Sequence, residues 1–362
     1  MTPNIRRIAI NTGGGDAPGL NAVIRAVVRS AERRGWEVFG IKDGYDGLFE
    51  TNGIVQLDRS SVRGITHLGG TIIGTTNRGD PLNWQIVDEE GSISVIDRSQ
   101  EVIDALAAHK IDALVAVGGD GSLSIAQALF EKGLNVIGVP KTIDNDLAAT
   151  NLTFGFLTAV ETATDAIDKL HSTAEAHERV MVVELMGRNA GWIALSAGVA
   201  ATADVILIPE IPYDIERVCD KIQERYTEGR NFAIVVVAEG AFPVGGEPLF
   251  RRQGGGKQHL GGIGAVLAEE IAETTGQETR HLVLGHLQRG GGPNAQDRML
   301  ALRFGAAAVD LVAEGRFGCM VALDPPDVLA VPLAEAIAET KNVPITSDIL
   351  KTARALGTCM GD

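Results

Sequence analysis

Two carboxylates and a lysine stand close together in residues 140–146, PKTIDND. The segment follows a hydrophobic run that predicts a β-strand. In extended geometry residues two apart point the same way, so Asp144 and Asp146 are expected to face one substrate hydroxyl. One would accept its proton and the other would be a positioning or metal-linked partner. Lys141 adds a charge suited to phosphate, and an Asx turn is the purely structural alternative.

A second candidate is the motif GGDGS at residues 118–122, which also follows a hydrophobic strand pattern. Open α/β proteins bind ligands at the carboxyl ends of their strands. Asp120 could hold Mg²⁺ there, because magnesium in phosphoryl-transfer sites commonly takes one or two carboxylates plus substrate phosphates. A turn aspartate that caps the following helix is the structural alternative.

A third candidate is the glycine-rich turn GGGDAPGLN at residues 13–21. Its glycines permit positive φ and close approach of a phosphate to the start of a helix. The turn lacks the GK[ST] of a Walker loop, and Gly13, Gly15 and Gly19 do not give the GxGxxG spacing of dinucleotide folds. We interpret it as a phosphate cradle, with an ordinary tight βα turn as the alternative.

Basic and acidic residues farther along suit an anionic sugar, because Arg and His bind phosphate while Glu accepts sugar hydroxyls. Any one of them alone would more often be a surface ion-pair partner. The set comprises Arg179, the segment 184–191 (ELMGRNAG), Glu239, Arg280 and the segment 284–291 (LGHLQRGG).

The elements that must position these residues alternate between strand and helix patterns. Short Val, Ile, Ala and Leu runs, 44 glycines and few aromatics predict an α/β fold with two lobes, each a largely parallel sheet flanked by helices. The active site is expected in the cleft between the lobes. Strands are predicted at Arg7 to Asn11, Glu37 to Ile41, Ala113 to Val117, Asn135 to Val139, Val180 to Leu185, Val205 to Ile208, Phe232 to Ala238 and His281 to Leu284.

The length of 362 residues suits two domains. We expect residues 1–145 to form a nucleotide-binding lobe that later segments complete, and residues 146–310 to form a sugar-phosphate lobe. Residues 311–362 are expected to supply a C-terminal strand and helices that pack back on the lobes.

Charge and hydropathy exclude several classes of function. The formal net charge is −15 at pH 7, which argues against binding to nucleic acid or an anionic membrane. No uncharged apolar run is long enough to span a bilayer and no signal-peptide pattern opens the chain, so we expect a cytoplasmic protein. The three cysteines are widely spaced and predict neither a zinc site nor disulfides.

Taken together, these motifs resemble the ATP- and pyrophosphate-dependent 6-phosphofructokinases. GGDAPGLN, GGDGS, PKTIDND, FGFLTA, ELMGR and LGHLQRGG occur in the family's order, and the resemblance covers at least residues 5 to 310. It implies phosphorylation of fructose 6-phosphate at the 1-hydroxyl in glycolysis. It also implies a homodimer or homotetramer with shared active sites, in which Arg179 and Arg280 reach the neighbouring subunit's pocket.

The resemblance assigns roles residue by residue. Asp144 would be the catalytic base, with Thr142 and Asp146 beside it and Arg188 supporting the transferred phosphoryl group. Asp120 would bind Mg²⁺. The nucleotide would be surrounded by Gly15, Arg78, Gly119, Asp120, Gly121 and Ser122. The sugar phosphate would contact Thr142, Ile143, Asp144, Asp146, Arg179, Met186, Gly187, Arg188, Glu239, Arg280, His286, Leu287, Gln288 and Arg289.

The identity of the phosphoryl donor depends on the residues at two positions, and in this chain these two residues favour different donors. ATP users of the family usually carry glycine at both positions 121 and 141, whereas pyrophosphate users tend to carry Asp and Lys. This chain has Gly121 and Lys141. We favour ATP, because Gly121 leaves room beside the nucleotide α-phosphate and Lys141 is a flexible point charge that either donor could tolerate.

Three other functions stay open at this stage: a pyrophosphate-dependent phosphofructokinase, another GGDG-type kinase and a non-enzymatic metabolite sensor. The resemblance also implies an effector pocket rich in basic residues. Arg25, Arg29, Arg59 and Arg230 supply part of it, whereas His171 and Glu228 stand where basic side chains would be expected. We therefore predict altered or weak control by ADP and phosphoenolpyruvate.

Overall fold

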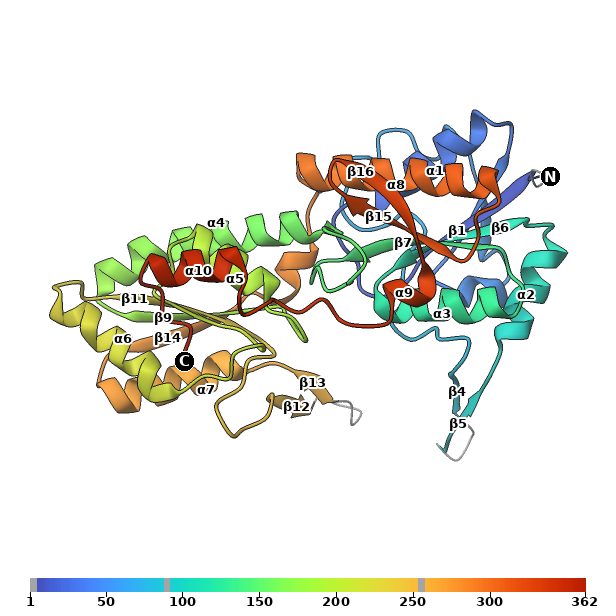
Figure 1. Ribbon diagram of the computed structural model, residues 1–362. Helices are drawn as coiled ribbons and strands as arrows, with labels where there is room; N and C mark the ends of the chain where they lie inside the picture. The colour runs from blue at the N-terminus through green and yellow to red at the C-terminus, as the bar shows by residue number, and fades with distance from the viewer. Residues whose placement is uncertain (1–4, 88–91, 253–257) are drawn as a thin grey trace. The chain divides into compact units, whose positions relative to one another are not determined.

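The computed structural model of the chain describes residues 5–87, 92–252 and 258–362, and its contacts divide the chain into two compact units (Figure 1). Unit 1 runs up to Ile143 and adds Leu147–Leu157 and Arg289–Glu339. Unit 2 consists of Asp144–Asp146, Thr158–Gln288 and Thr340–Asp362. The chain therefore passes between the units within the PKTIDND motif.

Unit 1 is built on a mixed sheet with the strand order β16-β15-β7-β6-β1-β2-β3, and β8 pairs with β7. The pairs from β15 to β2 are parallel, whereas β16 and β3 join the edges in antiparallel fashion. The strands are β1 (Arg7–Thr12), β2 (Glu37–Ile41), β3 (Ile54–Leu57), β6 (Ala113–Gly118), β7 (Val136–Thr142), β8 (Phe154–Gly155), β15 (Cys319–Asp324) and β16 (Asp327–Pro332).

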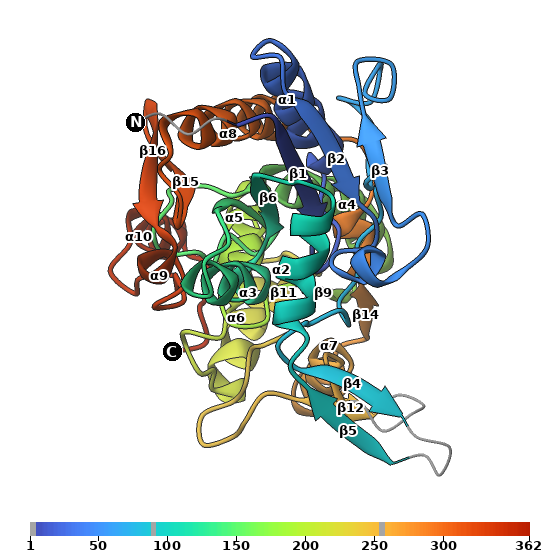
Figure 2. The same cartoon turned by 90° about the vertical axis from the view of Figure 1, so that its right-hand side faces the viewer.

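Helices cover both faces of this sheet, and the alternation of strand side chains supplies both cores. In β1, Ile8 and Ile10 pack into one buried cluster with residues of α1 and α8, while Ala9 packs into a second cluster with residues of α2, α3 and α9. α1 and α8 lie side by side in Figures 1 and 2. The helices are α1 (Leu20–Glu32), η1 (Asp46–Phe49), α2 (Ser99–Ala108), α3 (Asp120–Glu131), α8 (Ala295–Glu314) and α9 (Leu333–Ala336).

Unit 2 contains a parallel sheet with the order β10-β11-β9-β14. The strands β9, β10 and β11 are largely apolar and buried, whereas the edge strand β14 has the sequence TRHLV and is mostly exposed. The strands are β9 (Val180–Leu185), β10 (Val205–Leu207), β11 (Ala233–Ala238) and β14 (Thr279–Val283). The helices are α4 (Phe156–His177, whose first residues belong to unit 1), α5 (Trp192–Ala200), α6 (Ile215–Thr227), α7 (Ile263–Thr275), η2 (Gly285–Arg289, which ends at the first residue of a unit 1 segment) and α10 (Asp348–Ala355).

Two antiparallel hairpins stand apart from the sheets. One pairs β4 (Trp84–Val87) with β5 (Ile93–Ile96), and the other pairs β12 (Phe250–Arg252) with β13 (Gln258–Leu260). Figure 2 shows β4 and β5 extending away from the other strands of unit 1. The sequence reading did not predict either hairpin.

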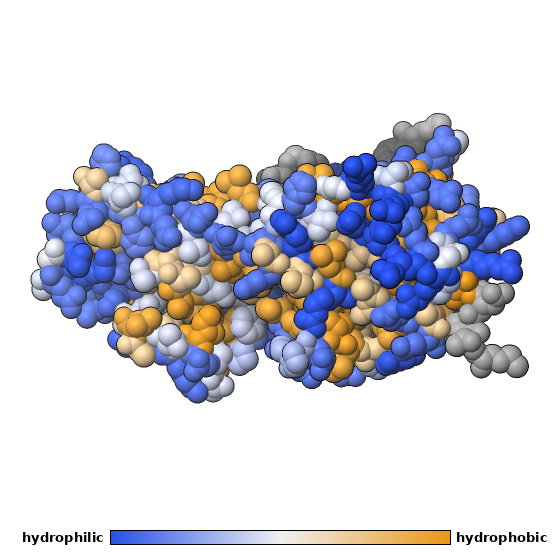
Figure 3. Space-filling model, turned by 90° about the horizontal axis from the view of Figure 1, so that it is seen from above, coloured by the Kyte–Doolittle hydropathy of each residue, from blue (hydrophilic) through white to orange (hydrophobic). Residues whose placement is uncertain are grey.

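The predicted fold class is confirmed, because parallel-dominated sheets with helices on their faces occupy both units. Each predicted strand is present with small shifts at its ends, and β7 continues to Thr142 instead of ending at Val139. Figure 3 shows a face on which hydrophobic and hydrophilic groups are interspersed. Among the described helices, none combines the length and apolar character needed to cross a membrane.

Candidate active site

The carboxyl ends of three neighbouring strands bring the three predicted motifs together in unit 1. β1 pairs with β6 in a register that matches Thr12 with Val117, and β6 pairs with β7 so that Gly118 matches Pro140. The strands are parallel, so the turns that follow them leave the same edge of the sheet. We call this region the donor edge, and it comprises residues 13–19, 118–122 and 140–142.

The first turn of the donor edge is shaped by glycine. Gly19, the N-cap of α1, has φ 115°, and a Cβ at this position would lie 2.6 Å from Cδ2 of Phe154. Both the conformation and the space therefore require glycine. The amide of Gly14 donates to the carbonyl of Thr76 at 3.0 Å, and the hydroxyl of Thr75 donates to the carbonyl of Gly14 at 2.6 Å. The turn is thus fixed before α1 begins.

Lys141 extends from the end of β7 to this turn. Its side chain is 3% exposed, and its ammonium donates a hydrogen bond to the carbonyl of Gly15. The interpretation of Lys141 as a flexible point charge is therefore wrong, because burial and this bond fix the side chain. The ammonium brings positive charge to the turn that we predict to cradle phosphate.

The segment with Asp120 opens α3. Gly119 is the N-cap of the helix, and the Asp120 side chain does not cap it, so the capping alternative for Asp120 is wrong. Among the hydrogen bonds and ion pairs of the described residues, none involves the carboxylate of Asp120, which is exposed. An exposed carboxylate at a helix N-terminus fits one oxygen ligand of Mg²⁺. The described residues hold no cluster of three His, Cys, Asp or Glu that could bind a metal, so phosphate oxygens would have to supply further ligands.

Open space surrounds Gly121, the second residue of α3. A Cβ built at this position meets nothing within 4 Å. In contrast, a Cβ at Gly118 would lie 2.2 Å from Cβ of Ser122, so Ser122 packs against the end of β6. Position 121 can therefore accept a side chain without disturbing the fold, and glycine there keeps the space beside the helix N-terminus clear.

Two predicted arginines lie at different places relative to the donor edge. The guanidinium of Arg289 donates to the carbonyl of Asp16 at 3.2 Å, and its Nη1 would lie 2.7 Å from a Cβ at Gly15. The structure thus places Arg289, predicted for the sugar phosphate, at the first turn. Arg78 is exposed, and its amide donates to the hydroxyl of Thr76, next to the turn. The roles of both arginines stay predictions.

The motif PKTIDND, which we call the acceptor motif, leaves the extended strand after Thr142. β7 ends at Thr142, and Asn145 has φ 53°. We had predicted that the side chains of Asp144 and Asp146 point the same way because the backbone is extended. The backbone is not extended here, so this reasoning is wrong. Asn145 is 4% exposed, whereas Asp144 and Asp146 are half-buried. Asn tolerates the left-handed region better than most residues, which explains its place between the two aspartates.

The ends of β9 and β11 bring two predicted segments together in unit 2. The amide of Gly240 donates to the carbonyl of Gly187 at 3.2 Å, and a Cβ at Gly240 would lie 2.1 Å from the carbonyl oxygen of Arg188. Glu239 therefore stands beside the segment 186–188. Met186 is buried, whereas Arg188 is exposed, so the guanidinium of Arg188 faces solvent.

Arg179 and Arg280 lie at the other end of the same sheet. Arg179 precedes β9, and Arg280 pairs in register with Met181. Both guanidinium groups contact the carboxylate of Glu278, at 3.0 Å for Arg179 and 2.6 Å for Arg280. β9 separates them from Arg188 by its whole length, roughly 16 Å at about 3.3 Å per residue. One copy of unit 2 does not bring these three arginines together.

The segment LGHLQRGG has mixed exposure. His286 is exposed, and Leu287 is 70% exposed. Gln288 is fully buried, and its amide donates to the carbonyl of Gly285 at 3.2 Å. The Gln288 side chain therefore stabilises this short helix, and its predicted contact with the substrate gains no support from the geometry.

Sequence analysis missed a carboxylate that supports the segment 186–191. Glu210 accepts from the amide of Gly191 at 3.0 and 3.1 Å and from the amide of Val343 at 2.7 Å. Burial raises the pKa of Glu210, while these amide donors act in the opposite direction. Glu210 belongs to no recognised motif, and Val343 lies far along the chain, so no sequence signal joined them.

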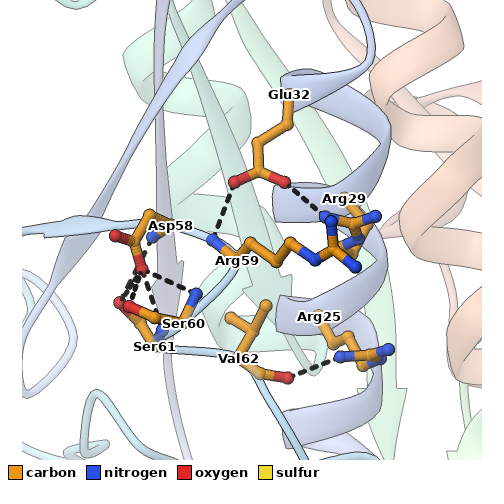
Figure 4. A network of polar contacts seen from close by, with 8 residues as sticks. All are labelled: Arg25, Arg29, Glu32, Asp58, Arg59, Ser60, Ser61 and Val62. Carbon is orange, nitrogen blue, oxygen red and sulfur yellow. Dashed lines mark hydrogen bonds and ion pairs between the residues drawn. The ribbon is translucent and has the colours of Figure 1, made fainter.

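Two of the predicted effector arginines, Arg29 and Arg59, contact the carboxylate of Glu32 in unit 1, and a third, Arg25, lies on the same helix as Arg29 (Figure 4). Glu32 pairs with the guanidinium of Arg29 at 2.7 Å and accepts from the amide of Arg59 at 2.7 Å. Arg25 donates to the carbonyl of Val62 at 2.7 Å. Arg230, Glu228 and His171 belong to unit 2, where His171 contacts the carbonyl of Ala201.

Comparisons with known proteins agree on the family, whereas the names of similar relatives differ in the phosphoryl donor. Residues 7–312 match the family model described as Phosphofructokinase. A protein of Chloroflexus aurantiacus (strain ATCC 29366 / DSM 635 / J-10-fl), named ATP-dependent 6-phosphofructokinase, is 51% identical over 100% of this chain and 99% of its own length. A protein of Amycolatopsis methanolica, named pyrophosphate–fructose 6-phosphate 1-phosphotransferase, is 52% identical over 93% of this chain and 96% of its own length.

A solved structure adds the same likeness at the level of the fold. The phosphofructokinase of Pichia pastoris in the T-state matches 99% of this chain with a TM-score of 0.80 and 30% sequence identity. The match covers 37% of the Pichia chain, so this chain spans little more than a third of that protein's length.

Proposed function

This chain belongs to the phosphofructokinase family and is a phosphotransferase that acts on fructose 6-phosphate, and we propose that Mg-ATP is its phosphoryl donor. The product is fructose 1,6-bisphosphate, which places the reaction in glycolysis. As a glycolytic enzyme it would act in the cytoplasm. The observation that carries the donor assignment is the open space at Gly121, next to the exposed carboxylate of Asp120.

The space matters because ATP has an α-phosphate and a nucleoside that pyrophosphate lacks. An acidic side chain at position 121 would fill this space and repel the α-phosphate, whereas Gly121 does neither. The full-length relative named ATP-dependent 6-phosphofructokinase supports the same donor. Pyrophosphate is the second candidate, because Lys141 is buried against the first turn and a relative of similar identity is named for pyrophosphate.

We assign the chemistry of phosphoryl transfer to four residues of the predicted motifs, as follows. Asp144 takes the proton of the acceptor 1-hydroxyl while that oxygen forms a bond to the γ-phosphorus, and the bond from this phosphorus to the ADP oxygen breaks. Arg188 supports the charge on the transferred group, and Thr142 orients the acceptor. Mg²⁺ held by Asp120 would neutralise charge on the donor phosphates when it is bound.

The sugar phosphate is assigned to a shared site. Arg179 and Arg280 lie at the opposite end of β9 from Arg188, so one unit 2 cannot direct all three at one ligand. An oligomer in which a neighbouring subunit supplies Arg179 and Arg280 would resolve this separation. His286, Glu239 and Met186 complete the proposed sugar-phosphate contacts.

The test is a donor assay on the purified chain, with fructose 6-phosphate and either Mg-ATP or Mg-pyrophosphate. We expect fructose 1,6-bisphosphate with ATP and little with pyrophosphate. Asp144→Asn should lower kcat by about 10² to 10⁴ while KM for fructose 6-phosphate changes only a few fold. A faster rate with pyrophosphate would overturn the donor assignment, and wild-type turnover of Asp144→Asn would remove Asp144 from the role of base.

A further inference from the structure

A short segment near residue 341 joins the acceptor motif to the segment that follows Arg188. The amide of Lys341 donates to the carbonyl of Asp146 at 2.8 Å. The carbonyl of Lys341 accepts from the indole Nε1 of Trp192 at 2.7 Å. Two residues later, the amide of Val343 donates to the carboxylate of Glu210, which also accepts from the amide of Gly191. The main chain of this segment therefore bridges two loops that the proposed function uses.

The side chain of Lys341 adds a third contact to the same turn. Its ammonium donates to Oδ1 of Asn145 at 3.0 Å and lies 5.9 Å from the centre of the Trp192 ring. Burial lowers the pKa of Lys341 to about 8, whereas the charge of Asp146 acts in the opposite direction. An ammonium kept in this partly desolvated place needs the Asn145 oxygen and the Trp192 ring as partners.

Asn145 is the residue through which Lys341 can act on Asp144. It directly follows Asp144, is nearly fully buried and has the left-handed conformation, with φ 53°, between the two aspartates. A left-handed asparagine often satisfies its side chain on local main-chain groups. Here Oδ1 accepts from Lys341, so the orientation of the turn depends on a residue almost 200 positions later.

We infer that Lys341 is a positioning residue for the phosphoryl-transfer reaction, because it fixes Asn145 and thereby sets Asp144 toward the acceptor hydroxyl. The inference rests on the proposed role of Asp144 as base. Lys341 needs no contact with either substrate, so its loss should affect the chemical step more than substrate binding. Small displacements of a catalytic group cost large factors in rate, up to about 10² for 1 Å.

The experiment compares Lys341→Met, Lys341→Arg and Lys351→Met in steady-state assays with both substrates varied. Lys341→Met should lower kcat by about tenfold to a hundredfold, with both KM values within about threefold of wild type. Lys341→Arg keeps the charge and the donor, so it should restore kcat to within about threefold of wild type. Lys351, exposed on α10, is the matched control and should leave all constants unchanged.

A second variant protects the test against misfolding. Asn145→Gly removes the Oδ1 acceptor, while glycine adopts the positive φ without strain. It should lower kcat as Lys341→Met does. The double variant should be no slower than the slower single variant, because both substitutions remove the same hydrogen bond between Lys341 and Asn145. Circular dichroism and size-exclusion chromatography would report folding. If Lys341→Met does not fold, Asn145→Gly alone decides.

Two outcomes would overturn the inference. One is wild-type kcat in a folded Lys341→Met or Asn145→Gly enzyme, and the other is full additivity of the two substitutions. The Asp144→Asn variant separates this failure from failure of the proposed function. If Asp144→Asn is slow and Lys341→Met is not, only the positioning role fails. If Asp144→Asn turns over normally, the base assignment fails first.

Discussion

The ammonium of Lys141 donates a hydrogen bond to the main-chain carbonyl of Gly15, so the end of β7 is tied to the first glycine-rich turn. The bond fixes a buried cation beneath the turn that we assign to the donor phosphates. A positive charge at this place suits either donor. Discrimination between ATP and pyrophosphate must then come from elsewhere at the donor edge, and Gly121 is the position with open space.

Gly121→Asp should abolish the use of ATP. The new carboxylate would occupy the space beside the α-phosphate and repel it at short range. Because a Cβ at position 121 meets nothing within 4 Å, the variant should fold like the wild type. The measurement is kcat/KM for ATP and for pyrophosphate, and we expect a small but measurable pyrophosphate rate to emerge.

Gly121→Ala is the matched control for this substitution. It adds a Cβ without charge and raises the helix propensity at the start of α3. It should keep ATP activity within a few fold of wild type. Equal losses in Gly121→Ala and Gly121→Asp would show that size, and not charge, controls the position. Undiminished ATP use by Gly121→Asp would show that the open space at Gly121 does not decide the donor.

Active sites shared between subunits should give complementation. Arg179→Ala and Asp144→Asn homo-oligomers should each be nearly inactive. A hybrid dimer would combine the defects in one site and leave the other site intact, so it should recover about half of the wild-type rate. Differently tagged subunits would allow the hybrid to be isolated before assay. No recovery in a verified hybrid would show that each site uses its own Arg179.

The arginine cluster of Figure 4 should respond weakly to ADP and phosphoenolpyruvate, because Glu32 already pairs with Arg29 and would repel an effector phosphate. Glu32→Gln should therefore strengthen the effect of ADP on the fructose 6-phosphate saturation curve. Glu37→Gln is the control, since Glu37 pairs with Arg7 at 2.6 Å instead. A strong ADP-dependent shift in the wild-type curve would contradict this prediction.

The carboxyl group of Glu210 should make stability depend on pH. Burial raises its pKa above the ordinary value of 4.5, so between these two values the folded chain binds more protons at Glu210 than the unfolded chain does. Through this group, the free energy of unfolding therefore increases as pH falls through that window. Glu210→Gln lacks the titration and provides the reference.

The measurement is the free energy of unfolding of wild type minus that of Glu210→Gln, from denaturant titrations between pH 7.5 and pH 4.5. This difference should increase toward the lower pH. A difference for Glu210→Gln that stays constant or falls would contradict the prediction.

Much of the parallel framework could be predicted because each strand is a compact apolar run followed by a motif. β1, β6 and β7 were found in this way, and their shared carboxyl edge follows from parallel pairing. The hairpin of β4 and β5 was missed, since each strand has only four residues and the exposed Ile86, Ile93 and Val95 do not join a buried core.

The candidate site was predictable only where its residues are close in sequence. PKTIDND suggested a chemical site, but its extended geometry was wrong because Asn145 turns the chain at positive φ. Lys341 and Glu210 could not be found, since Lys341 bonds the side chain of Asn145 from far along the chain and Glu210 binds main-chain amides, which every residue except proline carries. Such contacts leave no pattern in a single sequence.

The packing of α8 against α1 has a consequence for biosynthesis. The apolar face of α1 includes Leu20, Val23 and Val27, and its partner helix ends at Glu314. A ribosome adds about 5 to 20 residues per second, so nascent α1 emerges on the order of tens of seconds before α8 exists. During that interval the face is an open binding surface for chaperones and for other nascent chains. Slower translation lengthens this exposure, and the yield of folded enzyme in a cell should depend on how well chaperones cover α1 until α8 arrives.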